Sequence, residues 1–344
     1  MSGGVDSSVA AKLLLESGYE VTGIFLRFWK DESAPLAQAS FDDAREVAEK
    51  IGIPIIDLDM SGPFKREVVD YFLQEYQDGR TPNPCVACNK QVKLGRLLMY
   101  AKDMGYDAVA TGHYLRIRRS FGRYHLLRGL DSKKDQSYFL YTLSQEELSR
   151  LIFPLGRYRK TEVRQLAKAW DLPVYQKPES QDICFLSGPH NDFLKKHLSL
   201  VAGDIVDQAS GRIVGRHQGL PLYTIGQRRG IEIGGTGPYY ACEFNYQANI
   251  LYVTKTWDDQ KLYRLELKAE NVNWISGRWP QRPVSCQATI RYGHPGQSAK
   301  VYLDKEKKTA RVVFGKGQRA ITPGQSVAFY RKKRLLGGGV ISVL

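Results

Sequence analysis

The 344-residue sequence contains no uninterrupted run of about 18 apolar residues, the length that a helix needs to cross a bilayer. Its start also lacks the charged segment and apolar core of a secretory signal peptide. Cysteine is scarce, with five residues, an odd number, unevenly placed. These absences argue against a membrane protein and against a disulfide framework. We therefore expect a cytoplasmic protein without a membrane partner, whose thiols serve chemistry.

Acidic residues are too few to balance the basic ones. Lys and Arg number 50 and Asp and Glu number 36, which leaves a net charge of +14. A balance this basic favours a polyanionic partner, nucleic acid first and a membrane surface second, although solubility alone can also produce it. With 42% hydrophobic and 25% charged residues the chain is globular, and its length suffices for two or three domains.

Strands and helices alternate through the first half of the chain. The pattern predicts helices over residues 9–17, 41–52 and 63–79, and strands over residues 19–28, 53–60 and 106–114. Alternation at this spacing predicts an α/β, Rossmann-like domain over residues 1–190, with a parallel sheet and helices on both faces.

The sequence changes character near Gly203, where it becomes rich in glycine with short alternating runs. From Leu262 onward, short strands are separated by turns, a pattern typical of a small β-barrel or sandwich. We therefore predict a small, β-rich linking domain over residues 191–261 and a C-terminal β-barrel domain over residues 262–344.

The opening segment SGGVDSS, residues 2–8, has the composition of an anion site. Glycines let the backbone approach a phosphate, and the start of a helix supplies N–H donors and a favourable dipole. Serine hydroxyls add donors, and Asp6 can hold Mg²⁺. The segment is not a Walker A loop, because no Gly-Lys-Ser/Thr follows. A plain helix cap formed by Asp6 or Ser7 is the alternative.

Three cysteines lie in loops bordered by turn residues, the context of a reachable thiol. Cys85 and Cys88 occur in RTPNPCVACNK, and Cys184 occurs in KPESQDICFL. A C-x-x-C pair alone fits half a zinc site, a redox pair or iron–sulfur ligands. Cys242 and Cys286 have apolar, β-rich surroundings and are predicted to be structural.

Basic and aromatic residues are interleaved in two segments, residues 114–129 and 329–334. Phosphate contacts from such segments supply salt-dependent affinity for nucleic acid, and aromatic rings can hold an unstacked base. A solvated charged face is the alternative.

The motifs taken together carry a resemblance to a known family. SGGVDSS matches the PP-loop of ATP pyrophosphatases, and TPNPC-x-x-CN, ATGHY, KDQSYFL, SQDICF and HQGLPLYTIGQRRG follow in order. Across essentially its whole length the chain resembles the tRNA-specific 2-thiouridylases. The resemblance implies ATP-dependent 2-thiolation of uridine-34 in the anticodon of tRNAs for Lys, Glu and Gln. AMP is transferred to the C2 oxygen, and sulfur from a cysteine persulfide then replaces it.

The same resemblance implies roles for individual residues. Cys184 carries the persulfide and Cys88 is the nucleophile, and the two can form a transient disulfide that a reductant reopens. A cysteine desulfurase or a sulfur-relay protein is the implied sulfur donor. The implied ATP-binding residues, with Mg²⁺ near Asp6, are Ser2, Gly3, Gly4, Val5, Asp6, Ser7, Ser8, Leu26 and Gly112. The implied tRNA-binding residues are Asn83, Pro84, Cys85, His113, Lys134, Asp135, Gln136, Arg291, Tyr292 and Gln325, and the linking domain is also expected to bind tRNA.

Three alternatives remain at this point. Cys85, Cys88 and Cys184 could hold a 4Fe–4S cluster as the sulfur carrier. The chain could be a different PP-loop ligase that adenylates a small molecule, or a tRNA-binding protein with an inactive nucleotide site. In this superfamily a buried strand precedes the loop, whereas this sequence begins inside the loop. We therefore expect a sheet that is short by one strand.

Overall fold

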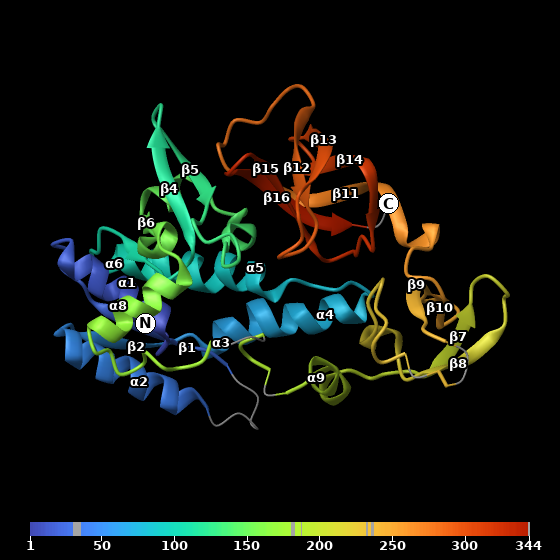
Figure 1. The fold of residues 1–344 in the computed structure, drawn as a ribbon, viewed down its shortest axis with the longest axis horizontal. Coiled ribbons are helices and arrows are strands. Elements are labelled where there is room, and N and C mark those ends of the chain that lie inside the picture. Colours follow the sequence, from blue (N-terminus) through green and yellow to red (C-terminus); the bar gives the residue numbers. More distant parts are fainter. Residues whose placement is uncertain (30–35, 180–182, 187, 232, 235–236, 343–344) are drawn as a thin grey trace.

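The computed structural model describes residues 1–344 except 30–35, 180–182, 187, 232, 235–236 and 343–344. Figure 1 shows an α/β part, a small β part at the far right, and a β-barrel between and above them. Within the described ranges, no helix has the length and apolar character that spanning a membrane requires.

The α/β part holds parallel strands, as predicted, but they form two separate pairs. Strand β1 (Gly23–Arg27) pairs with β2 (Ile55–Asp59), and β3 (Val109–Ala110) pairs with β6 (Leu151–Ile152). Met1 lies beside β1, where its amine donates a hydrogen bond to the carbonyl of Ile24. Burial lowers the pKa of this amine to about 5. The predicted single sheet is therefore divided in the described chain.

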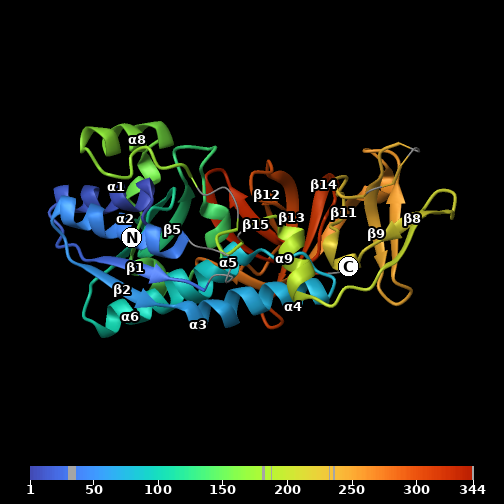
Figure 2. The same cartoon turned by 90° about the horizontal axis from the view of Figure 1, so that it is seen from below.

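Helices cover both faces of β1 and β2, as predicted (Figure 2). One face carries α1 (Val5–Glu16), α2 (Leu36–Ile51) and α8 (Lys160–Ala169). Buried side chains of all three pack together, among them Val9, Val47 and Val163. The other face carries α3 (Ser61–Phe64) and α6 (Leu97–Asp103), while α5 (Pro84–Cys88) leads into α6 and α4 (Tyr71–Gln77) extends beyond the strands toward the barrel. This packing fixes the start of α1, where the nucleotide loop lies.

Two π-helical turns connect these helices in pairs. Residues 65–70 join α3 to α4, and residues 89–96 join α5 to α6. A Cβ on Gly95 would lie 2.4 Å from the carbonyl oxygen of Lys90, so the second π-turn requires glycine there. Residues five apart are about 140° apart around an α-helix, but an i→i+5 turn brings them toward one face. The π-turn therefore aligns Lys93 with Cys88.

The remaining elements of the α/β part follow β3. They are the hairpin β4 (Leu115–Ser120) and β5 (Arg123–Arg128), a 3₁₀ turn (Ser137–Leu140), α7 (Gln145–Ser149) and a second 3₁₀ turn (Pro154–Arg157). The linking part contains α9 (His190–His197), β7 (Gly203–Asp207), β8 (Ile213–His217), β9 (Tyr240–Asn245) and β10 (Ile250–Thr254). Its sheet has the order β8-β7-β10-β9.

The C-terminal part is a closed barrel. Its strands are β11 (Tyr263–Trp274), β12 (Val284–Thr289), β13 (Gln297–Asp304), β14 (Thr309–Arg319), β15 (Ser326–Arg331) and β16 (Arg334–Ser342). They follow the order β11-β14-β13-β12-β15-β16, and β11 pairs with β16 to close the ring. The predicted class is thus confirmed: a Rossmann-like domain, a linking domain and a barrel.

The hairpin β4–β5 attaches the first part to the barrel. Strand β5 pairs with β16 where Leu127 faces Arg334, and the N–H of Arg128 donates to the carbonyl of Lys333 at 2.8 Å. The Tyr141 ring packs so closely on β16 that a Cβ on Gly338 would lie 2.6 Å from its Cγ. The two basic segments noted in the sequence, residues 114–129 and 329–334, are therefore neighbours.

Candidate functional site

The first feature of the site is the glycine turn in front of α1. Gly3 has φ +67°, and a Cβ there would lie 2.2 Å from the carbonyl oxygen of Ser40. Gly4 is the residue before the helix and is extended, so α1 begins at Val5, four residues before the predicted start at residue 9. The first N–H groups of a helix have no carbonyl partner within it and point toward an anion bound there.

The loop serines hold this turn in shape. The N–H of Ser2 donates to Ser7 Oγ at 3.0 Å, and the hydroxyls of Ser7 and Ser8 donate to the Gly4 carbonyl at 3.1 and 3.0 Å. Ser8 is fully buried. The hydroxyls thus organise the backbone of the loop, which is a role that the sequence alone did not distinguish from direct phosphate contact.

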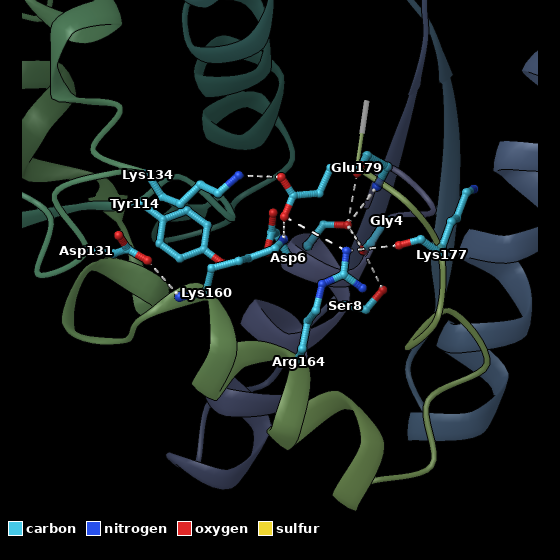
Figure 3. Close-up of polar contacts among 12 residues, drawn as sticks. Gly4, Asp6, Ser8, Tyr114, Asp131, Lys134, Lys160, Arg164, Lys177 and Glu179 are labelled. Atoms are coloured by element: carbon cyan, nitrogen blue, oxygen red, sulfur yellow. Dashed lines mark hydrogen bonds and ion pairs between the residues drawn. The ribbon is translucent and has the colours of Figure 1, made fainter. Parts of the chain in front are cut away.

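Asp6, the acid of the loop, points to two residues from distant segments (Figure 3). Its Oδ1 accepts hydrogen bonds from Tyr114 Oη and Lys160 Nζ, each at 2.6 Å. Burial and the contact with Asp6 raise the pKa of Tyr114, so the phenol keeps its proton and donates. The Lys160 side chain is only 10% exposed. Asp6 is therefore charge-compensated by a nearly buried ammonium.

Glu179 lies opposite this pair and contacts three cations. Its carboxylate is 2.5 Å from Lys134 Nζ, 3.2 Å from Lys160 Nζ and 3.9 Å from the guanidinium of Arg164. Figure 3 shows these side chains converging at the start of α1. Although partial burial opposes its charge, these cations keep the pKa of Glu179 below its ordinary value. The site thus concentrates positive charge beside the glycine turn.

The ATGHY segment reaches the same place from the end of β3. A Cβ on Gly112 would lie 2.9 Å from the carbonyl carbon of Asp6 and 3.0 Å from the nitrogen of Ser7. The next residue, His113, shares a 2.8 Å hydrogen bond between Nδ1 and Thr111 Oγ1. Burial, and then the charge of Lys93, lower the pKa of His113 to about 3. The imidazole is therefore neutral near pH 7.

Lys93 experiences the charges of the three cysteines that were predicted to lie in loops, although the structure places Cys85 and Cys88 in helix α5. Burial tends to lower the pKa of the Lys93 ammonium. The charges of Cys88, Cys184 and Cys85 outweigh burial, and together they raise this pKa. Burial likewise raises the pKa of Cys88 to about 12, and Lys93 opposes that rise. Cys85 and Cys184 are exposed, Cys88 is buried, and all are free thiols. Lys93 thus lies within electrostatic range of the three thiols and of His113, the residue after Gly112.

The segment before Cys88 is held by the barrel. Asn83 caps α5 by accepting the N–H of Val86 at 3.4 Å, and Pro84 is the first residue of that helix. Gln325, from the loop before β15, donates to the carbonyls of Thr81 and Pro82 at 2.9 and 3.1 Å. Gln325 thus fixes the approach to α5.

The Lys134–Gln136 turn is engaged within the protein. Asp135 is buried and accepts hydrogen bonds from Arg128, Gly129 and Ser137 at 2.9 to 3.2 Å. Gln136 Oε1 accepts the N–H of Tyr114 at 3.0 Å. Asp135 and Gln136 therefore order the turn that carries Lys134.

Arg291 and Tyr292 differ in exposure. The Arg291 guanidinium donates to the carbonyl of Ala320 at 3.0 Å and to Thr322 Oγ1 at 2.8 Å, so it braces the barrel loops. Tyr292 is 46% exposed and its ring lies 4.5 Å from that of Phe139. Burial, and charges that include Asp135 and Cys85, raise the pKa of Tyr292. Tyr292 therefore borders the thiol site and offers a ring surface.

Three further predicted residues have simpler surroundings. Leu26 is in β1 and packs against two apolar clusters. Cys242 is buried in β9 and its Sγ lies 3.2 Å from Gln208 Oε1, and Cys286 is half-buried in β12. Both lie in strands, as expected of structural cysteines.

Four residues of the site were not singled out by the sequence: Lys93, Tyr114, Lys160 and Glu179. Lys160 contacts Asp6 across 154 positions and Tyr114 does so across 108. No local pattern encodes contacts of that range. Lys93 depends on the π-turn, because an ordinary α-helix would turn it away from Cys88.

Family models match all three parts of the chain. Residues 1–188 match the tRNA methyl transferase HUP domain, residues 191–255 match the tRNA methyl transferase PRC-barrel domain, and residues 264–341 match the aminomethyltransferase beta-barrel domain. The solved structure of the U34-tRNA thiolase NcsA from Methanococcus maripaludis is 21% identical, with a TM-score of 0.36, over 53% of this chain and 58% of its own.

Curated relatives match over nearly full length. A protein of Roseiflexus sp. (strain RS-1), named tRNA-specific 2-thiouridylase MnmA, is 44% identical, and the match covers 99% of this chain and 98% of the relative. A protein of the same name from Methylococcus capsulatus is also 44% identical, covering 100% of this chain and 95% of its own. Identity of this extent, together with the three domain matches, means that the chain belongs to the tRNA-specific 2-thiouridylase family.

Proposed function

We propose that this protein uses ATP to convert the uridine at position 34 of tRNAs for Lys, Glu and Gln into 2-thiouridine. The observation that carries the proposal is the continuity of the site. The glycine turn touches Gly112, Gly112 is followed by His113, and the Lys93 charge links His113 to the three thiols. A uracil bound at this site would thus contact both the nucleotide and the cysteine that carries sulfur.

The first chemical step is activation of the base. The C2 oxygen of uracil attacks the α-phosphorus of ATP, pyrophosphate leaves, and the oxygen becomes part of a good leaving group, AMP. The helix start of α1 offers stabilisation for phosphate charge. Mg²⁺ bound with ATP would neutralise phosphate charge. Asp6 is the loop carboxylate that would hold it, although Tyr114 and Lys160 engage its Oδ1 in this structure.

The second step transfers sulfur. The terminal sulfur of a Cys184 persulfide bonds to C2, and AMP leaves. The Cys88 thiolate then attacks Cys184 Sγ, the persulfide S–S bond breaks, and thiouridine departs with the terminal sulfur. The product disulfide joins Cys88 to Cys184 and is reopened by a two-electron reductant. Because burial keeps Cys88 protonated here, the neighbouring ammonium of Lys93 is needed to favour its thiolate.

Methyl transfer, which the family models name, is less consistent with this site. Methylation of a base requires neither adenylation nor a persulfide, whereas the site combines a PP-loop with two reachable thiols, Cys85 and Cys184. A PP-loop ligase for a small molecule is also less consistent, since the two basic segments form one surface on the hairpin and β16.

A 4Fe–4S cluster on Cys85, Cys88 and Cys184 is the alternative sulfur carrier. Among the residues that the structure describes, no three His, Cys, Asp or Glu side chains are grouped so that they could hold a metal. The described thiols are therefore not grouped as the three ligands of such a cluster.

Several finer assignments stay predictions. They are the tRNA contacts of Asn83, Pro84, Cys85, His113, Lys134, Asp135, Gln136, Arg291, Tyr292 and Gln325, the adenine contact of Leu26, and the domain limits at 190/191 and 261/262. The cytoplasmic location and the sulfur donor, a cysteine desulfurase or a relay protein, stay predictions as well.

The test separates the two steps. ATP–pyrophosphate exchange measures adenylation on addition of tRNA, and mass spectrometry of digested tRNA measures thiouridine. Cys88→Ser and Cys184→Ser should retain exchange and lose thiouridine, whereas the barrel control Cys286→Ser should retain both. Full thiouridine formation by Cys184→Ser would contradict the persulfide route. Loss of activity in Cys85→Ser, with iron and sulfide in anaerobically purified protein, would favour the cluster.

A further inference from the structure

Glu179 and its cations form a group that the thiolation chemistry does not use. Lys134, Lys160 and Arg164 come from two different segments, yet all three approach one carboxylate. Lys160 and Arg164 are four residues apart on α8 and so project from the same face of the helix. Figure 3 shows that face directed at the start of α1.

The burial of Lys160 makes an anionic partner necessary. With 10% of its side chain exposed, its ammonium has lost most of its water, and a buried charge without a partner is costly. Asp6 supplies one partner at 2.6 Å, and Glu179 supplies a second at 3.2 Å. The Glu179 side chain is 30% exposed, so the second partner can be replaced from the solvent side.

A nucleotide bound at the glycine turn would bring its phosphates to this place. The start of α1 and the cations of α8 point toward the same region. A triphosphate placed there carries more negative charge than the single carboxylate of Glu179. The phosphates and Glu179 therefore compete for the same donors.

We propose that Lys160 and Arg164 bind the phosphates of ATP, and that Glu179 occupies their anion position until ATP displaces it. The proposal rests on the proposed function in one respect, that ATP binds at the glycine turn. It adds two binding residues and assigns Glu179 as an internal competitor. Displacement of Glu179 also releases Lys134, its closest partner.

The direction of the change in ATP affinity distinguishes this role from simple ion pairing. If the cluster only stabilises the fold, removal of either charge should leave ATP affinity unchanged or weaken it. If Glu179 competes with phosphate, Glu179→Gln should tighten ATP binding while Lys160→Met weakens it. The exposed pair Lys50–Asp171, 2.8 Å apart, provides matched controls in Lys50→Met and Asp171→Asn.

The experiment is calorimetric titration of the full chain with ATP and with inorganic pyrophosphate, without tRNA. We expect Glu179→Gln to bind ATP about threefold more tightly, Lys160→Met at least about tenfold more weakly, and both controls as the wild type does. If Lys160→Met fails to fold by thermal unfolding, Arg164→Met, at a partly exposed position, replaces it with a severalfold loss expected.

Two results would overturn the inference. One is unchanged or weaker ATP binding by Glu179→Gln, and the other is wild-type affinity in Lys160→Met or Arg164→Met, while the wild-type protein binds ATP. If the wild-type protein itself does not bind ATP, the proposed function fails together with this inference, and the two failures are thereby told apart.

Discussion

Gly112 provides the most direct test of how the nucleotide loop is built. In Gly112→Ala the new Cβ would lie 2.9 Å from the carbonyl carbon of Asp6 and 3.0 Å from the nitrogen of Ser7. Ordinary contact begins at 3.4 Å, so the start of α1 must retreat by about 3.4 − 2.9 = 0.5 Å. Both neighbouring atoms are backbone and cannot rotate away. Overpacking of this kind costs about 1–3 kcal/mol.

The expected result is a linked loss of stability and ligand binding. Part of the cost should appear as a lower midpoint of thermal unfolding, and the displaced N–H groups should weaken ATP binding about tenfold in calorimetry. Gly234→Ala is the control, because no atom of the described residues lies within 4 Å of the Cβ position there. Wild-type unfolding and wild-type ATP affinity in Gly112→Ala would refute the close approach of Gly112 to the loop.

Three further predictions concern other parts of the site. Gln325→Ala should lose about 1 kcal/mol of stability and slow thiouridine formation with unchanged ATP affinity, since it releases only the carbonyls of Thr81 and Pro82; unchanged activity would contradict a role in holding α5. Asp135→Asn should destabilise by about 2–3 kcal/mol in chemical unfolding, because a buried charge that accepts several hydrogen bonds is lost. Burial lowers the pKa of His113 to about 3, so the unfolded chain takes up a proton below about pH 6.5 while the folded chain does not, and stability falls as the pH falls. By pH 5 the wild type should have lost about 2 kcal/mol that His113→Gln retains, and parallel pH profiles of unfolding would show this reasoning to be wrong.

The parts of the site that local chemistry specifies were predictable from the sequence. Two glycines followed by small polar residues indicate a turn before a helix, which is a short-range effect, although α1 begins at Val5 and not at the predicted residue 9. The turn residues around Cys85 and Cys184 predicted exposed thiols, which is correct for these two, but Cys85 and Cys88 lie in α5 and not in a loop, and Cys88 is buried. The alternation of strands and helices predicted the parallel pairings and the helices on both faces.

Long-range contacts were not predictable. Lys160 owes its position to the packing of α8 against α1, which involves residues more than 150 positions apart, and Glu179 meets Lys160 from a segment that follows α8. The alignment of Lys93 with Cys88 depends on a π-turn that helix propensity does not reveal. The division of the parallel strands into two pairs likewise follows from tertiary arrangement, since β1 and β3 each satisfy the strand pattern.

The attachment of the hairpin to the barrel has a consequence for dissecting this protein. Because β5 continues the edge of β16, and Tyr138 and Tyr141 are buried with Ala328, a cut near residue 262 would expose an apolar face on each fragment. Neither fragment should then remain monodisperse by itself. Loss of activity on truncation would therefore reflect the disrupted packing between the hairpin and the barrel, and it would not by itself identify a lost contact with RNA.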